Sequence, residues 1–95
     1  WWQRRALITD LPSEDHAQLL MTMVQLRTDD GIALGDIVKA MDAVEGFGAR
    51  TEEGESRKEY VRRLLGELMR LRDQDHELMK IVEEDENGHW FAVGV

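Results

Sequence analysis

The chain has 95 residues, a length that fits one domain built around one hydrophobic core. Apolar residues make up 42% and charged residues 34%, a balance that excludes low-hydrophobicity disorder. Twenty acidic against twelve basic side chains give a formal net charge of -8, so the whole chain repels nucleic acid and anionic lipid unless its cations are segregated. The lack of cysteine excludes disulfide scaffolds, thiolate zinc sites, thiol catalysis and iron–sulfur clusters.

The apolar segments of the chain are short. No stretch approaches the roughly 20 apolar residues that a membrane helix needs. The first residues, Trp1 to Arg5, lack the long apolar run of a signal peptide. We therefore expect a cytoplasmic protein with no membrane contact. Because the chain starts with Trp1 and not with methionine, we also expect it to be a piece of a longer product.

Residues 1–12 are predicted to form an N-terminal arm, as a strand or an extended segment, although Ala6-Leu7-Ile8 is too short to exclude a helix. A first helix is predicted over residues 14–28. Ser13 can cap its free amides, and two acidic residues follow where the helix dipole favours negative charge. The sequence Thr28-Asp29-Asp30-Gly31 then supplies turn chemistry.

A second, short helix is predicted over residues 33–45, where apolar side chains recur three or four residues apart, at Leu34, Ile37, Val38, Met41 and Val44. Residues 46–55 contain three glycines and no sustained periodicity, which indicates a loop of about ten residues. This loop is longer than the usual connection between two helices, and we expect it to be the most mobile part of the chain.

A third helix is predicted over residues 56–74. Ser56 and Glu59 have the spacing of a capping box, in which two free amides are satisfied reciprocally. Residues in this segment divide between two halves of a helical wheel. The apolar half holds Tyr60, Val61, Leu64, Leu65, Leu68, Met69 and Leu71, and the polar half holds Glu59, Arg62, Arg63, Gly66 and Arg70.

An antiparallel hairpin is predicted over residues 78–95, since Asn87-Gly88 between two β-prone runs is a strong two-residue turn signal. With that turn, Val82 faces Val93, and the core side of the hairpin holds Val82, Phe91, Val93 and Val95. Trp90, Ala92 and Ile81 then fall on the other side, with Trp90 partly exposed or in a partner contact. A turn longer by one residue reverses this assignment.

This order of helix, short helix, loop, amphipathic helix and hairpin resembles the winged helix-turn-helix family over residues 14–95. Residues 32–41 are similar to its supporting helix, residues 56–71 to its recognition helix and residues 79–95 to its wing. The expected fold is thus mainly α with a C-terminal β-hairpin (α+β), a single winged-helix-like domain over residues 1–95. The resemblance implies a third helix in the major groove of DNA and a wing that touches phosphates or the minor groove.

The charge distribution singles out the third helix. Residues 56–72 carry six cations and two anions, whereas residues 1–55 carry five cations and eleven anions, and residues 73–95 one cation and seven anions. We therefore expect a cytoplasmic, dimeric transcription regulator that binds duplex DNA and needs no cofactor. Its expected contact residues are Arg57, Lys58, Arg62, Arg63 and Arg70. The same arginines could instead pair with acidic surfaces of their own molecule.

The predicted wing has four successive carboxylates, residues 83–86, which would repel phosphate. This feature favours an alternative function, a winged-helix protein-interaction or assembly subunit that does not bind DNA. Its expected partner contacts are Trp1, Trp2 and Trp90, since tryptophan is enriched in interface hot spots.

Other residue clusters are weaker signals. Residues 83–88 have the alternating oxygen ligands of a calcium loop, but Gly94 stands where the bidentate glutamate should be. His16, His76 and His89 do not have metal-ligand spacing. The acidic residues and histidine at positions 73–77 lack a nucleophile or a phosphate loop. We therefore expect no metal site, no catalytic residue and no enzymatic activity.

Overall fold

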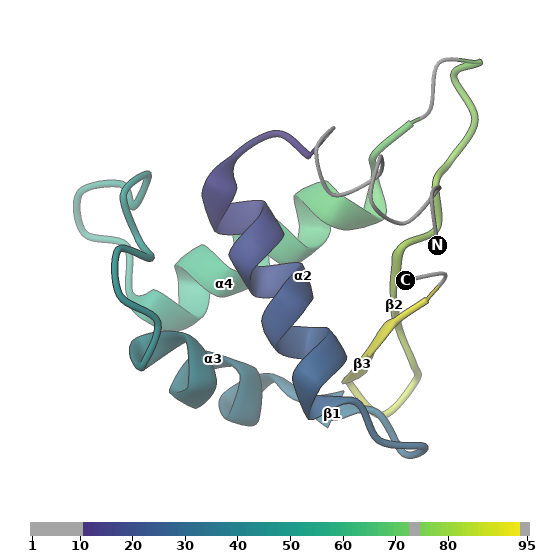
Figure 1. The fold of residues 1–95 in the computed structure, drawn as a ribbon, viewed down its shortest axis with the longest axis horizontal. Helices are drawn as coiled ribbons and strands as arrows, with labels where there is room; N and C mark the ends of the chain where they lie inside the picture. Colours follow the sequence, from purple (N-terminus) through teal and green to yellow (C-terminus); the bar gives the residue numbers. More distant parts are fainter. Residues whose placement is uncertain (1–10, 73–74, 94–95) are drawn as a thin grey trace.

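The computed structural model describes residues 11–72 and 75–93 and contains three helices packed beside a small antiparallel sheet, an α+β fold (Figure 1). The elements in chain order are α2 (Glu14–Leu26), β1 (Ile32–Ala33), α3 (Leu34–Asp42), α4 (Arg57–Met69), β2 (Val82–Glu84) and β3 (His89–Ala92). The predicted arm lies mainly in residues 1–10, outside the described residues, as do the two N-terminal tryptophans. Within the described ranges, no helix is long and apolar enough to cross a membrane.

Helix α2 begins where the sequence predicts. The Ser13 hydroxyl accepts a hydrogen bond from the His16 amide, which satisfies one of the free donors of the first turn. The helix ends at Leu26, two residues earlier than predicted, and the chain turns through residues 28–31. Gly31 has φ +84° in this turn, and a Cβ there would lie 2.7 Å from the Phe91 ring, so both the backbone conformation and the close approach require glycine.

Four residues of the predicted second helix lie outside the observed one: Ala33 belongs to the sheet, and residues 43–45 belong to the following turn. Ile32 and Ala33 form β1, and Ile32 pairs with Trp90 of β3. Helix α3 begins at Leu34 with Ala33 as its N-cap, which makes no side-chain capping bond, and ends at Asp42 instead of the predicted residue 45. A two-residue strand is too short for period-two patterning to predict it.

Helix α4 has the predicted capping box: the Glu59 amide donates to the Ser56 hydroxyl, and the Glu59 carboxylate accepts from the Ser56 amide. The helix ends at Met69, not near residue 74 as predicted. Beyond it the chain reverses direction, because the Met79 amide donates to the Leu71 carbonyl and Arg72 forms a β-bridge with Leu78.

The hairpin register differs by one residue from the prediction. Val82 pairs with Ala92, and Glu84 pairs with Trp90. The loop has three residues, Glu86 to Gly88, because the Asp85 carboxylate accepts hydrogen bonds from the Asn87 and His89 amides and thereby starts the turn one residue earlier.

This shift moves the side chains of β3 to the opposite face of the sheet, whereas Val82 stays in the core as predicted. Trp90 and Ala92 join Val82 in the core, and Phe91 is half-buried on the other face. The prediction that Phe91 lies in the core and Trp90 at the surface is therefore wrong: the Trp90 side chain is only 4% exposed. The expected core residue Val95 lies outside the described residues.

One hydrophobic core joins the helices and the sheet. Helix α4 contributes five buried apolar side chains and packs against α2, α3 and β2. Its opposite face is therefore the one that remains at the surface. The core consists of Leu19, Leu20, Met23, Ile32, Ile37, Met41, Phe47, Tyr60, Val61, Leu64, Leu65, Leu68, Ile81, Val82, Trp90 and Ala92.

Candidate nucleic-acid interface

A stripe of residues spaced by four runs along the outer face of α4 and ends at its C-cap, Arg70. The stripe consists of Lys58, Arg62, Gly66 and Arg70. Residues at this spacing lie one above another on a helix. The three cations of the stripe are exposed, and the structure gives none of them an ion pair with another described residue. These three cations are the part of the predicted DNA-contact set that lies open to a partner.

Arg57 has a different role. Its Nε lies 3.3 Å from the Asp42 Oδ1, and its Nη1 donates a hydrogen bond of 3.2 Å to the Phe47 carbonyl. The guanidinium carbon also lies 5.1 Å from the centre of the Phe47 ring. Arg57 therefore ties the first turn of α4 to the end of α3 and to the loop between the two helices.

Arg63 holds the same loop further along. Its Nε and Nη2 donate to the two Glu55 carboxylate oxygens at 2.9 and 3.0 Å, and its Nη2 also donates to the Arg50 carbonyl at 3.0 Å. The hydrogen bond from Arg63 lowers the pKa of Glu55 and, in return, raises the pKa of Arg63. In the unbound chain, two of the five predicted DNA-contact residues are thus engaged with carboxylates of their own molecule.

A buried acid anchors the loop from its inner side. The Tyr60 hydroxyl and the Gly48 amide both donate hydrogen bonds to the Asp15 carboxylate. The ring of Phe47 lies 5.4 Å from that of Tyr60, between centroids. The loop that the sequence predicts to be mobile is therefore attached to α2 and α4 by specific contacts. Burial, and then the hydrogen bond to Asp15, raises the pKa of Tyr60 to about 12.

A second buried polar contact joins α2 to α4. His16 is 1% exposed, and its Nε2 lies 2.9 Å from a Glu67 carboxylate oxygen. Its Nδ1 lies 2.6 Å from the Ser13 hydroxyl. Ser13, His16 and Glu67 are thus joined in one line of contacts, in the order of a catalytic triad. The Ser13 hydroxyl, however, already accepts the capping bond from the His16 amide, and the His16 ring is enclosed. The arrangement therefore caps α2 and fixes its packing on α4.

One exposed carboxylate, Glu59, lies on α4 beside Lys58, and further carboxylates lie on either side of the helix. The loop before α4 exposes Glu45, Glu52 and Glu53, and the hairpin exposes three more glutamates, at positions 83, 84 and 86. Figure 1 shows this loop and the hairpin on opposite sides of the molecule. A polyanion that approaches α4 therefore meets attraction along the stripe and repulsion from both flanks.

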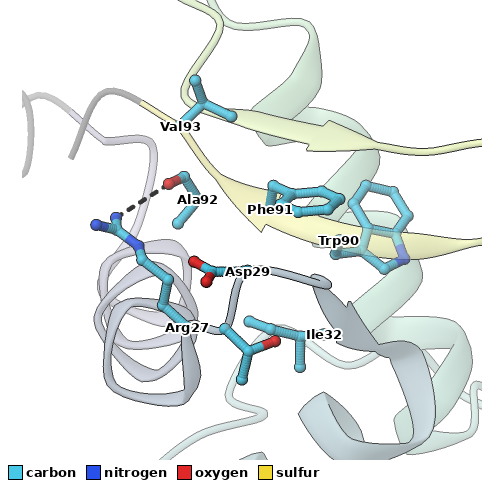
Figure 2. Close-up of a pocket in the computed structure, with 8 residues that line it drawn as sticks. Arg27, Asp29, Ile32, Trp90, Phe91, Ala92 and Val93 are labelled. Carbon is cyan, nitrogen blue, oxygen red and sulfur yellow. Dashed lines mark hydrogen bonds between the residues drawn. The ribbon is translucent and has the colours of Figure 1, made fainter.

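A hollow of about 400 Å³ lies between the end of α2 and β3 (Figure 2). Its floor is apolar, with Ile32, Trp90 and Ala92 buried, and the Arg27 guanidinium donates a 3.0 Å hydrogen bond to the Ala92 carbonyl. Asp29 lies at the same rim. With one cation and one carboxylate in its lining, the hollow has no anion-binding character, and no α4 residue takes part in it.

Comparisons with known proteins return no match, whether against protein families, curated proteins or solved structures. In residues 11–72 and 75–93, no group of three histidine, aspartate or glutamate side chains is placed to hold a metal ion. Sequence reasoning found the cationic face of α4 but missed the contacts of Asp15 and His16, since nothing in their local pattern indicates partners about 50 residues away.

Proposed function

We propose that this chain is a winged-helix domain of a transcription regulator and that it binds duplex DNA through the outer face of α4. The observation that carries the proposal is the exposed stripe of Lys58, Arg62 and Arg70 on a helix whose other face is the centre of the core. A rigid helix that presents cations in a row suits the phosphates that line a groove.

The order of the elements supports the fold part of the proposal. Three helices followed by a hairpin are the arrangement of the winged helix-turn-helix family, and α4 takes the place of its recognition helix. Because Arg57 and Arg63 bind carboxylates of their own molecule, the proposed DNA-contact set has three residues instead of the five expected from the sequence. These two arginines then act as positioning residues, because they fix the loop against the start of α4.

The acidic flanks limit how the duplex is bound. Because the hairpin exposes glutamates, we propose that it does not bind the DNA phosphates as a basic wing would. Binding then depends on α4 and falls steeply with salt, with a slope of log affinity on log salt of at most about -3 per protomer for three phosphate contacts. In a homodimer, the two α4 helices would double the number of phosphate contacts and the magnitude of this slope.

Fluorescence anisotropy with a labelled random duplex, at about 50 and 200 mM salt, tests the proposal. We expect measurable binding at the lower concentration and its loss in the triple variant Lys58→Ala, Arg62→Ala, Arg70→Ala. Lys39→Ala is the control for net charge, since Lys39 is an exposed helical cation outside α4. Absence of binding by the wild-type chain at low salt would rule the proposal out.

The acidic hairpin favours a second candidate function, a protein-interaction module whose partner is basic. In that case the wild-type chain shows no duplex binding at either salt concentration. Trp90 is not a surface anchor for such a partner, because it is buried, and Trp1 and Trp2 lie outside the described residues. Light scattering run beside the anisotropy measurement gives the mass of the free chain and of any complex.

A further inference from the structure

Gly66 is the one position of the cationic stripe on α4 without a side chain. It lies one turn after Arg62 and one turn before Arg70, in the middle of the outer face. Glycine is the least favourable residue for a helix interior after proline, because it loses the most backbone freedom on folding. The presence of glycine in the interior of α4, in place of a better helix former, therefore requires an explanation.

The fold itself gives no such explanation. The backbone of Gly66 is helical, a conformation that every residue except proline adopts readily. A Cβ added there would meet the Arg70 guanidinium, at 3.5 Å from Nη2, which is ordinary contact with the end of a flexible side chain. The three atoms nearest to that position all belong to this guanidinium, and none belongs to another element.

The same contact shows where the charge of Arg70 lies. Long side chains on a helix point back toward its N-terminus, and the Arg70 guanidinium accordingly lies over Gly66. The charge is thus displaced by about one helical turn toward Arg62. The Arg70 guanidinium therefore covers the helix backbone at Gly66, where a larger side chain would compete with it for the same space.

We infer that the Arg70 guanidinium, which lies over Gly66, is the central contact of α4 with a backbone phosphate of bound duplex, and that Arg62 contacts a phosphate one turn before it. This inference depends on the proposed DNA-binding function and names its central contact. Guanidinium groups bind phosphate oxygens in a bidentate manner, and the missing side chain at Gly66 lets the Arg70 guanidinium lie close to the outer face of the helix.

The variant Gly66→Gln tests the inference, because glutamine is uncharged, is favoured in helices and would displace the Arg70 guanidinium from its place over residue 66. Gly35→Gln is the matched control: Gly35 is an exposed glycine of α3, and a Cβ there has no neighbour within 4 Å. We expect both variants to raise the thermal unfolding midpoint. Only Gly66→Gln should weaken duplex binding at about 50 mM salt, by about tenfold, and reduce the magnitude of the salt slope by about one, the value for one lost phosphate contact.

The outcomes separate this inference from the proposed function. If Arg62→Ala weakens binding while Gly66→Gln keeps the wild-type affinity and salt slope, the inference is wrong and the proposed function stands. If wild type itself does not bind, both fail. A lower unfolding midpoint for Gly66→Gln would assign the glycine to the fold and also overturn the inference. Gly66→Ala completes the series, with a loss of affinity smaller than that of the glutamine variant.

Discussion

The Tyr60 hydroxyl donates a hydrogen bond to the Asp15 carboxylate in the interior of the molecule, across the contact between α4 and α2. The Gly48 amide donates to the same carboxylate at 3.2 Å. One acid that is 5% exposed thus joins two helices and the loop that precedes α4. Because a buried polar group without a partner is costly, this contact fixes the position of the loop and with it the start of the cationic helix.

The ionisation of Tyr60 should reduce stability at high pH. Its pKa in the folded chain is raised to about 12 from 10.0, first by burial and then by Asp15. The stabilisation from the protonated phenol is therefore complete below pH 10 and is lost as the pH rises toward 12. Tyr60 is the only tyrosine, so the ultraviolet absorbance of tyrosinate reports its titration directly. A titration midpoint at the ordinary value in the folded chain would contradict this prediction, and Tyr60→Phe should lack this contribution.

Removal of the buried acid should destabilise the chain. Asp15→Ala leaves the Tyr60 hydroxyl and the Gly48 amide without their acceptor, a loss of about 1–3 kcal/mol in the free energy of unfolding. Urea denaturation measures this loss. In a double-mutant cycle with Tyr60→Phe, the two changes should cost less together than the sum of their separate effects. Strict additivity would show that the contact contributes nothing to stability.

Two glycines with the same backbone conformation allow conformational strain to be separated from crowding. Gly31 and Gly54 have φ of +84° and +79°, but only at Gly31 would a Cβ lie within 3 Å of other atoms, those of Phe91 and His89. Gly54→Ala should cost about 1–2 kcal/mol, the penalty for a left-handed conformation. Gly31→Ala should cost more, because the Phe91 ring must also move. Equal losses of stability in urea would refute the role of crowding.

The sequence predicts the elements of this fold better than their ends. Serine caps located the start of α2 to the residue and that of α4 to within one residue, since capping is a local interaction. The apolar periodicity of α4 continues to Leu71, yet the helix ends at Met69, because Leu71 takes part in a backbone contact with Met79. The hairpin turn likewise depends on the Asp85 side chain, which the Asn87-Gly88 signal does not include.

The candidate site was predictable only in part, for a similar reason. A helical wheel places Arg62 and Arg70 on the polar face, and the structure agrees. It cannot distinguish Arg62 from its neighbour Arg63, because the path of a ten-residue loop decides which of them meets Glu55. Long-range partners come from chain topology, which local periodicity does not contain.

The adjacent residues Arg62 and Arg63 should respond differently to alanine substitution. Arg62→Ala should weaken duplex binding and reduce the magnitude of the salt slope by about one. Arg63→Ala removes the loop contacts to Glu55 and Arg50, so it should lower the unfolding midpoint. Its effect on the salt slope should be smaller than that of Arg62→Ala. Anisotropy and thermal unfolding of both variants measure these effects, and an equal change of slope would show that Arg63 also contacts phosphate.

The hairpin carboxylates should oppose DNA binding in a salt-dependent way. Glu84→Gln with Glu86→Gln removes two exposed charges from the hairpin, and we expect affinity for random duplex to rise several-fold at about 50 mM salt and less at about 200 mM, where screening is stronger. The matched control is Asp29→Asn with Asp30→Asn, which removes two exposed charges from the turn between α2 and β1.

A larger gain for the hairpin pair than for this control would indicate that the hairpin lies near the bound duplex, because a change in net charge alone acts equally on both. Equal gains would place the hairpin away from the DNA and leave α4 as the sole contact. A decrease in affinity for the hairpin pair would contradict the repulsive role of these glutamates, since a neutral side chain in their place can only reduce their repulsion of phosphate.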